Sequence, residues 1–396
     1  MNCNRVKFSK EVKLIILVTV ITLLFTSCSF QIIDEDKNNI EKTDRSNPEI
    51  DIKQDGEKIE SDSENNQSNE DNKKSVDSND NESNDIDNEK PIQIDYQTVK
   101  PNEIGHIIVV MYHGIKDIPP YHITEEQFTE QLQFMYDHGY RPISMRDYID
   151  NNIDIEAGCT PIVLTFDDGL KSTFSLIEEN GDLVPKTGTA IEILERFSKE
   201  HPGFDSKAAL YINGTAIFEG AGTVEERLNW LVDHGYDIGN HTATHVKLNK
   251  ISSREIMSEI GIVDQLIKNA IPEYKVDSFS YPFGIRPVKA LRNLVAKGEY
   301  KEIEYNYVIG LREGPSGPYY SPLHVKFNSL NVARARGSKG EVQDLWWFLE
   351  DYEKHPERKY ISDGNPNRIS ILEKDEEHVN KDKLGDKELY LYKLNQ

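Results

Sequence analysis

The sequence predicts an α/β protein built on a parallel sheet, either open or closed into a barrel. Three observations support this class. Short β-branched, apolar runs alternate with amphipathic helical segments from about Ile104 onward, which is typical of a parallel sheet. Several runs end in Gly, Asp or His, where such folds place their chemistry. A polar, acidic stretch with few apolar residues precedes them, and we expect it to lie outside the fold.

The first strand expected is His106–Gly114, a β-branched apolar run that ends in glycine. Two helices that share the same start and end signals should follow. Their capping boxes are Thr124–Gln127 and Thr223–Glu226, and both helices end at the sequence "DHGY". His138 and His234, within these two "DHGY" sequences, are therefore predicted to be helix-end residues, where a cation suits the helix dipole.

The later elements continue the alternation. A third capping box, Ser252–Glu255, opens a helix with an apolar stripe from Ile256 to Ala270. Further strands are expected at Lys207–Asn213, Val276–Pro282 and Asn306–Leu311. The segment Leu176–Phe197 separates a strand from its helix and is interpreted as a β-hairpin or a rim element.

Three regions are expected along the chain: residues 1–28, 29–100 and 101–396. In the first, basic residues precede an apolar run from Leu14 to Phe25, as in a secretory signal peptide. Small residues before Cys28 resemble a bacterial lipobox, which would make Cys28 a lipidated first residue. Ordinary cleavage nearby is the alternative. The second is an acidic, disordered tether, with 20 acidic and 8 basic residues from Asp34 to Lys90. The third is the folded domain.

Composition excludes some partners. The net charge of −23 argues against nucleic acid as a partner. Of the three cysteines, Cys3 is lost with the signal peptide and Cys28 is assigned above. Cys159 is then left without a disulfide partner and is interpreted as a residue that packs in the core. We expect a monomer.

The sequence "HTATH" is a candidate metal-binding segment. Its His241 and His245 are four residues apart, which would put both imidazoles on one face of a helix. The pattern alone is also compatible with an exposed turn. Its position after a strand end, at the same sheet edge as Asp167 and Asp168, favours a metal site.

Two adjacent carboxylates end the apolar run "IVLTFDDG". Neighbouring side chains on a strand point to opposite faces, so Asp167 and Asp168 can have different roles. One completes a His, His, Asp metal site, and the other stays off the metal as a general base. Two like charges this close also require a cation between them.

These residues resemble the motifs of a known family. "TFDDG" and "HTATH" are similar to the first two motifs of the polysaccharide deacetylases, the NodB-type carbohydrate esterases of family 4. The resemblance covers Ile104 to about Arg336 and is strongest with a secreted bacterial subgroup. It implies a distorted (β/α) barrel of seven strands. It also implies a hydrolase of non-peptide carbon–nitrogen bonds that removes N-acetyl groups from an N-acetylglucosamine polysaccharide.

The resemblance implies a role for each residue. Asp167 would be the catalytic base, and Asp168, His241 and His245 the ligands of a divalent metal, with Zn²⁺ expected and Co²⁺ or Ni²⁺ as alternatives. "SYPFG" is similar to the third motif, so the segment from Tyr281 through Pro282 to Phe283 would line the site. The N–H of Phe283 would stabilise the oxyanion.

Three positions depart from the family pattern or fit it loosely. Ser280 stands where an arginine usually steadies the base, which leaves open what holds Asp167. His324, in "SPLHVKF", is the candidate general acid, with a surface-loop histidine as the alternative. His113 either shapes the pocket or is a hydrogen-bonded structural histidine.

The expected function is removal of N-acetyl groups from peptidoglycan or secreted poly-N-acetylglucosamine. We expect the protein outside the cytoplasm, lipid-anchored to the bacterial membrane and facing the cell envelope, with an N-acetylated glycan polymer as its partner. Two alternatives stay open: an O-acetyl polysaccharide esterase, and an inactive glycan-binding lipoprotein.

Overall fold

The computed structural model describes residues 94–214, 217–314, 317–337 and 343–395. The expected signal peptide, Cys28 and the tether up to residue 93 lie outside the described residues. The last residues assigned to the tether are ordered, because Tyr96–Val99 forms helix α2 with Asp95 as its N-cap. No helix in these described ranges is long and apolar enough to cross a membrane.

Seven parallel strands close into a barrel, which confirms the predicted fold. Around the barrel the order is β1 (Ile108–Tyr112), β12 (Val332–Arg336), β11 (Ile309–Glu313), β8 (Ser278–Ser280), β7 (Asp237–Asn240), β6 (Ala209–Ile212) and β3 (Thr160–Phe166). The ring closes where β3 pairs with β1 over the register Ile108↔Ile162 to Tyr112↔Phe166. A further strand, β2 (Tyr140–Pro142), pairs with the first half of β3, and β6 pairs with its last residues.

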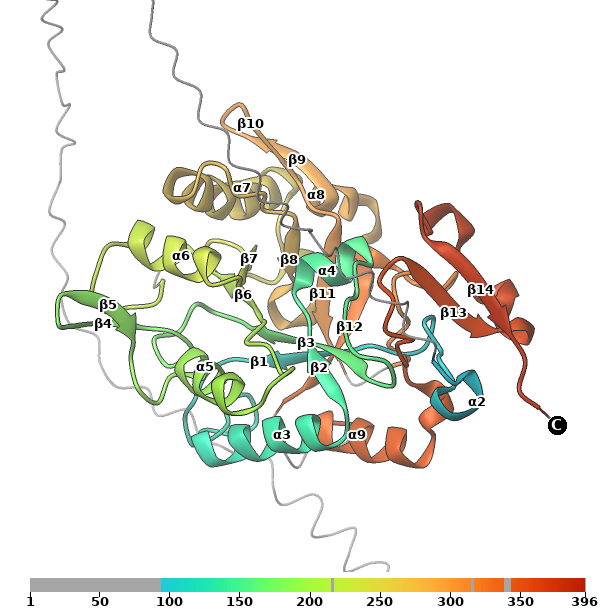
Figure 1. Ribbon diagram of the computed structural model, residues 1–396. Helices are drawn as coiled ribbons and strands as arrows, with labels where there is room; N and C mark the ends of the chain where they lie inside the picture. Colours follow the sequence, from blue (N-terminus) through green and yellow to red (C-terminus); the bar gives the residue numbers. More distant parts are fainter. Residues whose placement is uncertain (1–93, 215–216, 315–316, 338–342, 396) are drawn as a thin grey trace, which may run out of the picture. The chain divides into compact units, whose positions relative to one another are not determined.

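Helices surround the barrel (Figure 1). The helices of the barrel domain are α3 (Glu125–Asp137), α4 (Met145–Asp150), α5 (Ala190–Glu200), α6 (Val224–Asp233), α7 (Ser253–Ala270), α8 (Asn293–Ala296) and α9 (Leu345–Lys354). Short 3₁₀ turns are η1 (Leu248–Lys250), η2 (Pro282–Gly284), η3 (Lys289–Leu291), η4 (Ser329–Asn331), η5 (Pro356–Arg358), η6 (Glu373–His378) and η7 (Lys381–Lys383).

The three predicted capping boxes are present at the starts of α3, α6 and α7. The predicted helix-end histidines are also confirmed. His138 and His234 are the C-caps of α3 and α6, and their Nδ1 atoms lie 2.8 and 2.6 Å from the carbonyl oxygens of Phe134 and Trp230. Each imidazole therefore donates a second hydrogen bond to a last-turn carbonyl that already accepts one from the backbone N–H of the same histidine.

The strands are buried on both faces, as a parallel barrel requires. On β1, Ile108, Val110 and Tyr112 pack in the large core beneath the helices, whereas Val109 belongs to a smaller core with Val163 and Tyr211. The same alternation runs along β3. Continued past Val163, it places Thr165 and Asp167 on the side of the smaller core.

Three two-stranded elements are added to the barrel. The segment Leu176–Phe197 begins as the predicted hairpin, β4 (Leu176–Glu179) with β5 (Asp182–Pro185), and its remainder is the first part of α5. A second hairpin is β9 (Lys297–Tyr300) with β10 (Ile303–Asn306). The chain ends with a parallel pair, β13 (Arg368–Leu372) and β14 (Glu388–Tyr392), which lies beside α2 (Figure 1).

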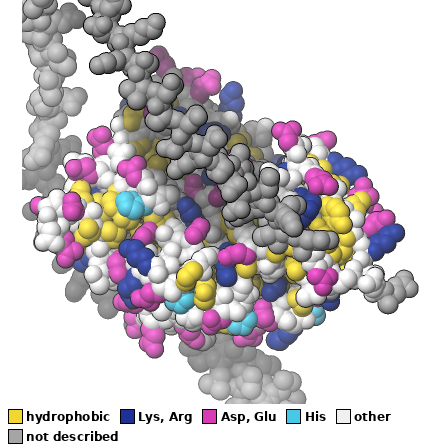
Figure 2. Space-filling model, viewed as in Figure 1, with side chains coloured by type: hydrophobic (Ala, Val, Ile, Leu, Met, Phe, Trp, Pro, Cys, Tyr) yellow, Lys and Arg dark blue, Asp and Glu magenta, His cyan; other side chains and the backbone are white. Residues whose placement is uncertain are grey.

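The surface carries charges of both signs. On the face shown in Figure 2, acidic and basic side chains are interspersed over the described residues rather than gathered into one basic patch.

Candidate active site

Asp167 and Asp168 follow the last residue of β3 and separate there. Asp167 keeps the strand alternation and is 2% exposed. Asp168 has a φ of 76°, in the left-handed region that aspartate tolerates better than most residues. Gly169, with a φ of 63°, continues the turn. The chain thus turns sharply between two carboxylates, so the predicted division into two different environments is present in the structure.

Asp168, His241 and His245 come together. One oxygen of Asp168 and one ring nitrogen from each histidine lie within 4.8 Å of one another, and they form the one such group in the described ranges. The Nε2 atoms of His241 and His245 lie 3.5 and 3.6 Å from Asp168 Oδ1. These residues bracket a space that a divalent ion fits.

One of the two histidines, His241, also has the tautomer that metal binding requires. His241 Nδ1 lies 2.8 Å from the carbonyl oxygen of Ser280, so Nδ1 donates its proton and the Nε2 lone pair faces Asp168. Asn213 donates to Asp168 Oδ1 across 3.4 Å. Of the two arrangements that their spacing left open, a helix and a turn, the two histidines adopt the turn. A turn with positive φ at Thr242 (65°) and His245 (54°) brings them together.

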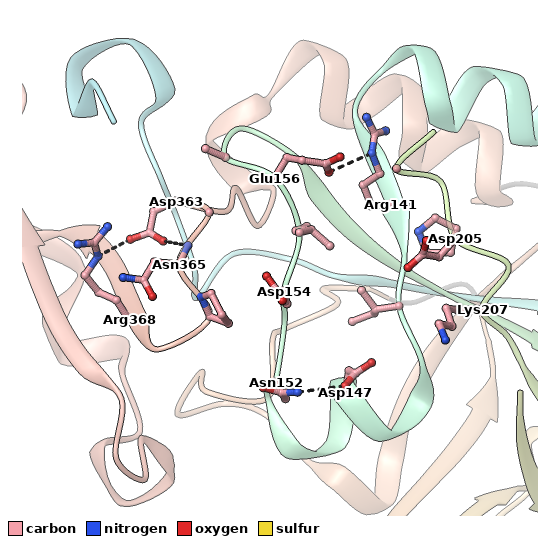
Figure 3. Close-up of a pocket in the computed structure, with 17 residues that line it drawn as sticks. Arg141, Asp147, Asn152, Asp154, Glu156, Asp205, Lys207, Asp363, Asn365 and Arg368 are labelled. Atoms are coloured by element: carbon pink, nitrogen blue, oxygen red, sulfur yellow. Dashed lines mark hydrogen bonds and ion pairs between the residues drawn. The ribbon is translucent and has the colours of Figure 1, made fainter. Parts of the chain in front are cut away.

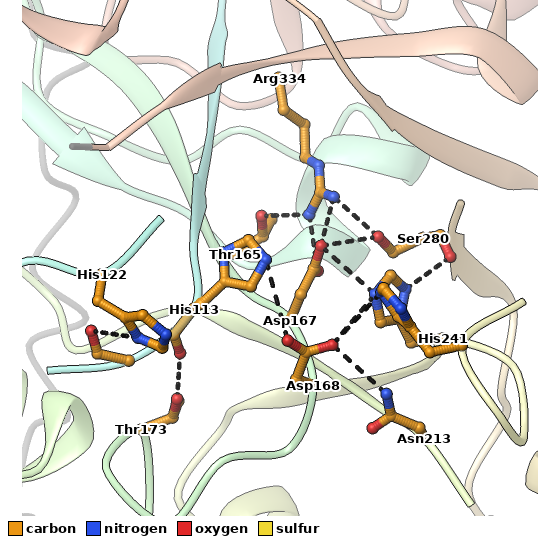
Figure 4. Close-up of polar contacts among 12 residues, drawn as sticks. His113, His122, Thr165, Asp167, Asp168, Thr173, Asn213, His241, Ser280 and Arg334 are labelled. Carbon is orange, nitrogen blue, oxygen red and sulfur yellow. Dashed lines mark hydrogen bonds and ion pairs between the residues drawn. The ribbon is translucent and has the colours of Figure 1, made fainter. Parts of the chain in front are cut away.

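Arg334 answers the question of what holds Asp167 (Figure 4). It projects from β12 and is 1% exposed. Its Nη1 and Nη2 atoms donate to Asp167 Oδ1 and Oδ2 across 2.8 and 2.6 Å. The guanidinium also donates to Thr165 Oγ1 (3.0 Å) and Ser280 Oγ (2.8 Å), and Ser280 Oγ donates to Asp167 Oδ2 (3.1 Å). Ser280 is therefore part of the network that replaces the expected arginine.

The charge environment keeps Asp167 ionised. Burial alone would raise its pKa, but the opposite charge of Arg334, together with His241 and His113, holds that pKa far below its usual range. The sequence interpretation had missed Arg334. A signal was present in "VARAR" (residues 332–336), because an arginine on the inward side of a buried strand requires a carboxylate partner.

His113 lies on the other side of Asp168. Its Nε2 is 3.9 Å from Asp168 Oδ2, and its buried Nδ1 has no hydrogen-bond partner among the described residues. Burial lowers the pKa of His113, whereas the charges of Asp167 and Asp168 act in the opposite direction. Of the two interpretations left open, the structural one lacks the hydrogen bond that would support it.

A cavity of about 370 Å³ opens above these groups. Tyr281 and Phe283 line it, as predicted, together with the loop after β1. Pro282 begins η2 and is buried beside them. The Tyr281 hydroxyl donates to the backbone carbonyl of Leu330 across 3.0 Å, so this hydroxyl has a structural partner within the protein.

The structure does not bring His324 to this cavity. Its backbone bridges to Val379, its ring stacks on His378, and its Nδ1 accepts from the backbone of Lys326 at 3.0 Å. Its neighbour Tyr320 bridges to His106, which precedes β1, so His324 lies toward the amino ends of the strands. Burial, followed by the nearby His378, lowers the pKa of His324 to about 4.

A larger cavity, about 690 Å³, lies near the amino ends of β3 and β6 (Figure 3). Ion pairs such as Arg141–Glu156 (3.3 Å) and Arg368–Asp363 (2.6 Å) occupy its walls. It contains none of the potential metal ligands found together in the described residues. The smaller cavity is therefore the candidate active site.

Comparisons with known proteins agree with the motifs. Residues 154–303 match the profile of the polysaccharide deacetylase family, a segment that includes the Asp pair, both histidines and Tyr281–Phe283. The "Putative polysaccharide deacetylase YxkH" of Bacillus subtilis is 21% identical over 187 residues, which are 47% of this chain and 60% of that protein. The chain thus matches less than two thirds of that relative.

Two solved bacterial structures are among those similar to this chain. The "putative polysaccharide deacetylase BA0330" of Bacillus anthracis is 20% identical, with a TM-score of 0.46 over 65% of this chain and 70% of its own. The Streptococcus pyogenes deacetylase PplD, solved with acetate, is 19% identical, with a TM-score of 0.43 over 59% of this chain and 92% of its own. Because both TM-scores are below 0.5, the fold is assigned from the strand pairing described above and not from these structures.

The barrel and its Asp, His, His group define an α/β-barrel protein with a site suited to a divalent metal. The segment that carries this site, residues 154–303, matches the model of the polysaccharide deacetylase family. Arg334 lies beyond the matched segment.

Proposed function

We propose that the protein is a metal-dependent N-deacetylase of an N-acetylglucosamine polysaccharide, either peptidoglycan or secreted poly-N-acetylglucosamine, at the cell envelope. The observation that supports this most is the pairing of two kinds of group in one cavity. An ionised, buried carboxylate held by Arg334 lies beside an Asp, His, His group. This is the arrangement needed for a general base next to a metal.

Asp168, His241 and His245 would hold the metal. Two imidazoles and one carboxylate suit Zn²⁺, and also Co²⁺ or Ni²⁺. The metal would supply Lewis-acid polarisation of the acetyl carbonyl and a lowered pKa for the attacking water. Ser280 and Asn213 orient the ligands His241 and Asp168 through the hydrogen bonds described above.

Asp167 would take the proton from the attacking water. Its Oδ2 lies 3.8 Å from His241 Nε2, so the base adjoins the ligand group without replacing a ligand. Arg334 and Ser280 fix the carboxylate in one orientation, which is what an efficient base requires. The N–H of Phe283 is the proposed donor to the oxyanion.

We assign proton delivery to the leaving amine to His113, in place of His324. His113 lines the cavity and contacts Asp168 Oδ2, whereas His245 contacts Oδ1 and His324 does not line the cavity. Because burial lowers the pKa of His113, its protonated form is a stronger acid than ordinary imidazolium. The reaction then consumes one water and releases acetate and a free amine.

The location and partners are part of the proposal. A lipid anchor at Cys28 followed by an acidic tether would hold a monomer at the outer face of the membrane, within reach of an acetylated glycan. Acetylated polysaccharide is the substrate class of the family. New amines would add positive charge to that glycan.

Acetate release from four substrates tests this function. The purified full-length chain is supplied with zinc or with a chelator, and is offered purified peptidoglycan, poly-N-acetylglucosamine, N-acetylglucosamine oligomers and O-acetylated xylan. Zinc-dependent release from an N-acetylated glycan supports the proposal. Release from xylan alone would make the protein an O-acetyl esterase, and glycan binding without any release would make it an inactive binding protein.

A further inference from the structure

Large apolar side chains gather at the mouth of the candidate active site. Of the ten large hydrophobic residues that are exposed in the described ranges, Ile118, Tyr121 and Phe283 line this one cavity. Tyr121, in the loop after β1, is 41% exposed, and Phe283, in η2, is 50% exposed. Exposed apolar groups that gather at a cavity mark a surface for binding a ligand.

Folding does not explain Phe283. Its φ of 57° lies in the left-handed region, where the Cβ of a bulky residue crowds the following carbonyl oxygen and strains the backbone. Half of its surface is exposed, so burial recovers only part of that cost. Strained residues that persist in a structure are concentrated at functional sites.

Tyr121 and Phe283 adjoin opposite ends of the reacting groups. The ring of Tyr121 lies 5.3 Å from the ring of His113, and the ring of Phe283 lies 4.5 Å from that of His245. His113 and His245 are each in contact with a different oxygen of Asp168. Figure 4 shows His113 and His241, the other ligand, on opposite sides of Asp168.

Each of these two rings is also held by a cation. The Arg336 guanidinium lies 5.2 Å from the centre of the Tyr121 ring, and the Lys247 ammonium lies 5.1 Å from that of Phe283. A cation on one face of an aromatic ring stabilises that ring position. Both rings are therefore oriented before a ligand arrives.

We propose that Tyr121 and Phe283 are stacking platforms for the two sugar rings that adjoin the ring being deacetylated. The C–H face of a pyranose is apolar, and an aromatic ring can cover it. The cavity of about 370 Å³ is at the small end for ligand sites, so it suits one sugar with its acetamide, and neighbouring sugars must lie against the rim. The site then takes an internal unit of a glycan with at least three rings. This inference rests on the proposed function.

The test is the dependence of kcat/KM on chain length. Zinc-loaded full-length protein is assayed for acetate release on N-acetylglucosamine oligomers from the dimer to the hexamer. The variants are Tyr121→Ala and Phe283→Ala, with Tyr121→Phe and Phe283→Tyr as conservative partners. Trp347→Ala is the matched control, because Trp347 is 44% exposed on α9 and does not line the cavity.

The wild type should turn over the hexamer more efficiently than the dimer. Each alanine variant should lower kcat/KM on the hexamer by roughly 2- to 10-fold, mainly through KM, because one aromatic stack contributes about 0.5–1.5 kcal/mol. The conservative variants should keep the preference, and Trp347→Ala should match the wild type. The proposal of stacking platforms would be overturned by equal kcat/KM for dimer and hexamer. It would also be overturned if neither alanine substitution changed kcat/KM on the hexamer.

Binding separates this inference from the proposed function. Calorimetry with the hexamer is run on Asp167→Asn and on Asp167→Asn combined with Tyr121→Ala. Weaker binding by the double variant supports the platforms even if the wild type releases no acetate, a result that would overturn the deacetylase alone. Hexamer binding that is equal in both proteins, or absent from both, would overturn the platforms.

Discussion

Replacing Arg334 with methionine is the sharpest perturbation of this site. The substitution keeps an unbranched side chain but removes the guanidinium, which makes two hydrogen bonds to Asp167 at 2.8 and 2.6 Å. Asp167 is then left 2% exposed without its main counter-charge. Breaking a buried ion pair from one side costs about 3–5 kcal/mol, so the free energy of unfolding at pH 7 should fall by that amount.

The pH dependence of stability and of kcat/KM tests the Arg334–Asp167 pair independently. In the wild type the pKa of Asp167 is depressed, so this group stabilises the fold above its unfolded pKa of about 3.8, and that stability is lost as pH falls through the folded value. In Arg334→Met, the positive charge that outweighed the effect of burial is gone, so burial should raise the pKa of Asp167. Its contribution to stability at neutral pH should change sign, and the acid limb of kcat/KM should move to higher pH.

Denaturant unfolding at pH 7 and a pH–rate profile check both effects. Arg336→Met is the matched control on the same strand, because Arg336 pairs with Glu313 at 2.7 Å in a partly exposed position, where an ion pair contributes about 1 kcal/mol or less. If Arg334→Met unfolds within 1 kcal/mol of the wild type and keeps the same acid limb, Arg334 does not hold the base.

Three further predictions follow from the same geometry. His245→Ala should abolish stoichiometric zinc binding measured by equilibrium dialysis, whereas His138→Ala, at a helix end, should leave it intact; zinc retained by His245→Ala would remove that residue from the ligand set. His113→Ala should lower kcat by about 10²–10⁴-fold and His324→Ala by less than about 2-fold, and the reverse order would return the acid role to His324. Burial, followed by the charge of Asp363, raises the pKa of Glu103 to about 8. The folded state therefore holds a proton that the unfolded state loses above its pKa of about 4.5, and stability should fall as pH rises from about 5 to 8. Glu103→Gln should flatten that slope in denaturant melts, and an unchanged slope would show that Glu103 is not its source.

The sequence was informative wherever one segment contains its own signal. The alternation of strands and capped helices predicted the barrel, because the periodicity of each element is local. "TFDDG" and "HTATH" indicated three ligands and a base, since strand ends in a parallel sheet converge at one edge. For the segment from His241 to His245 the sequence left a helix and a turn open, because spacing alone cannot reveal the positive φ at Thr242.

Contacts between distant segments were the part that could not be predicted. Arg334 is 167 residues from Asp167, and only closure of the barrel through β12 and β1 brings their strands together. His324 is the converse case, because a local sequence pattern suggested a role that the fold does not support. Its local sequence suited a general acid, but the chain after β11 runs toward the amino ends of the strands.

The most direct measurement is acetate release from the N-acetylglucosamine hexamer by zinc-loaded wild type and by zinc-loaded Asp167→Asn, with bound zinc quantified in both. The account predicts zinc in both proteins, release by the wild type, and a rate at least about 10²-fold lower in Asp167→Asn. Equal rates in two zinc-replete proteins would contradict the role of Asp167 as the base. No release by a zinc-replete wild type, from this hexamer or from peptidoglycan, would contradict the N-deacetylase itself.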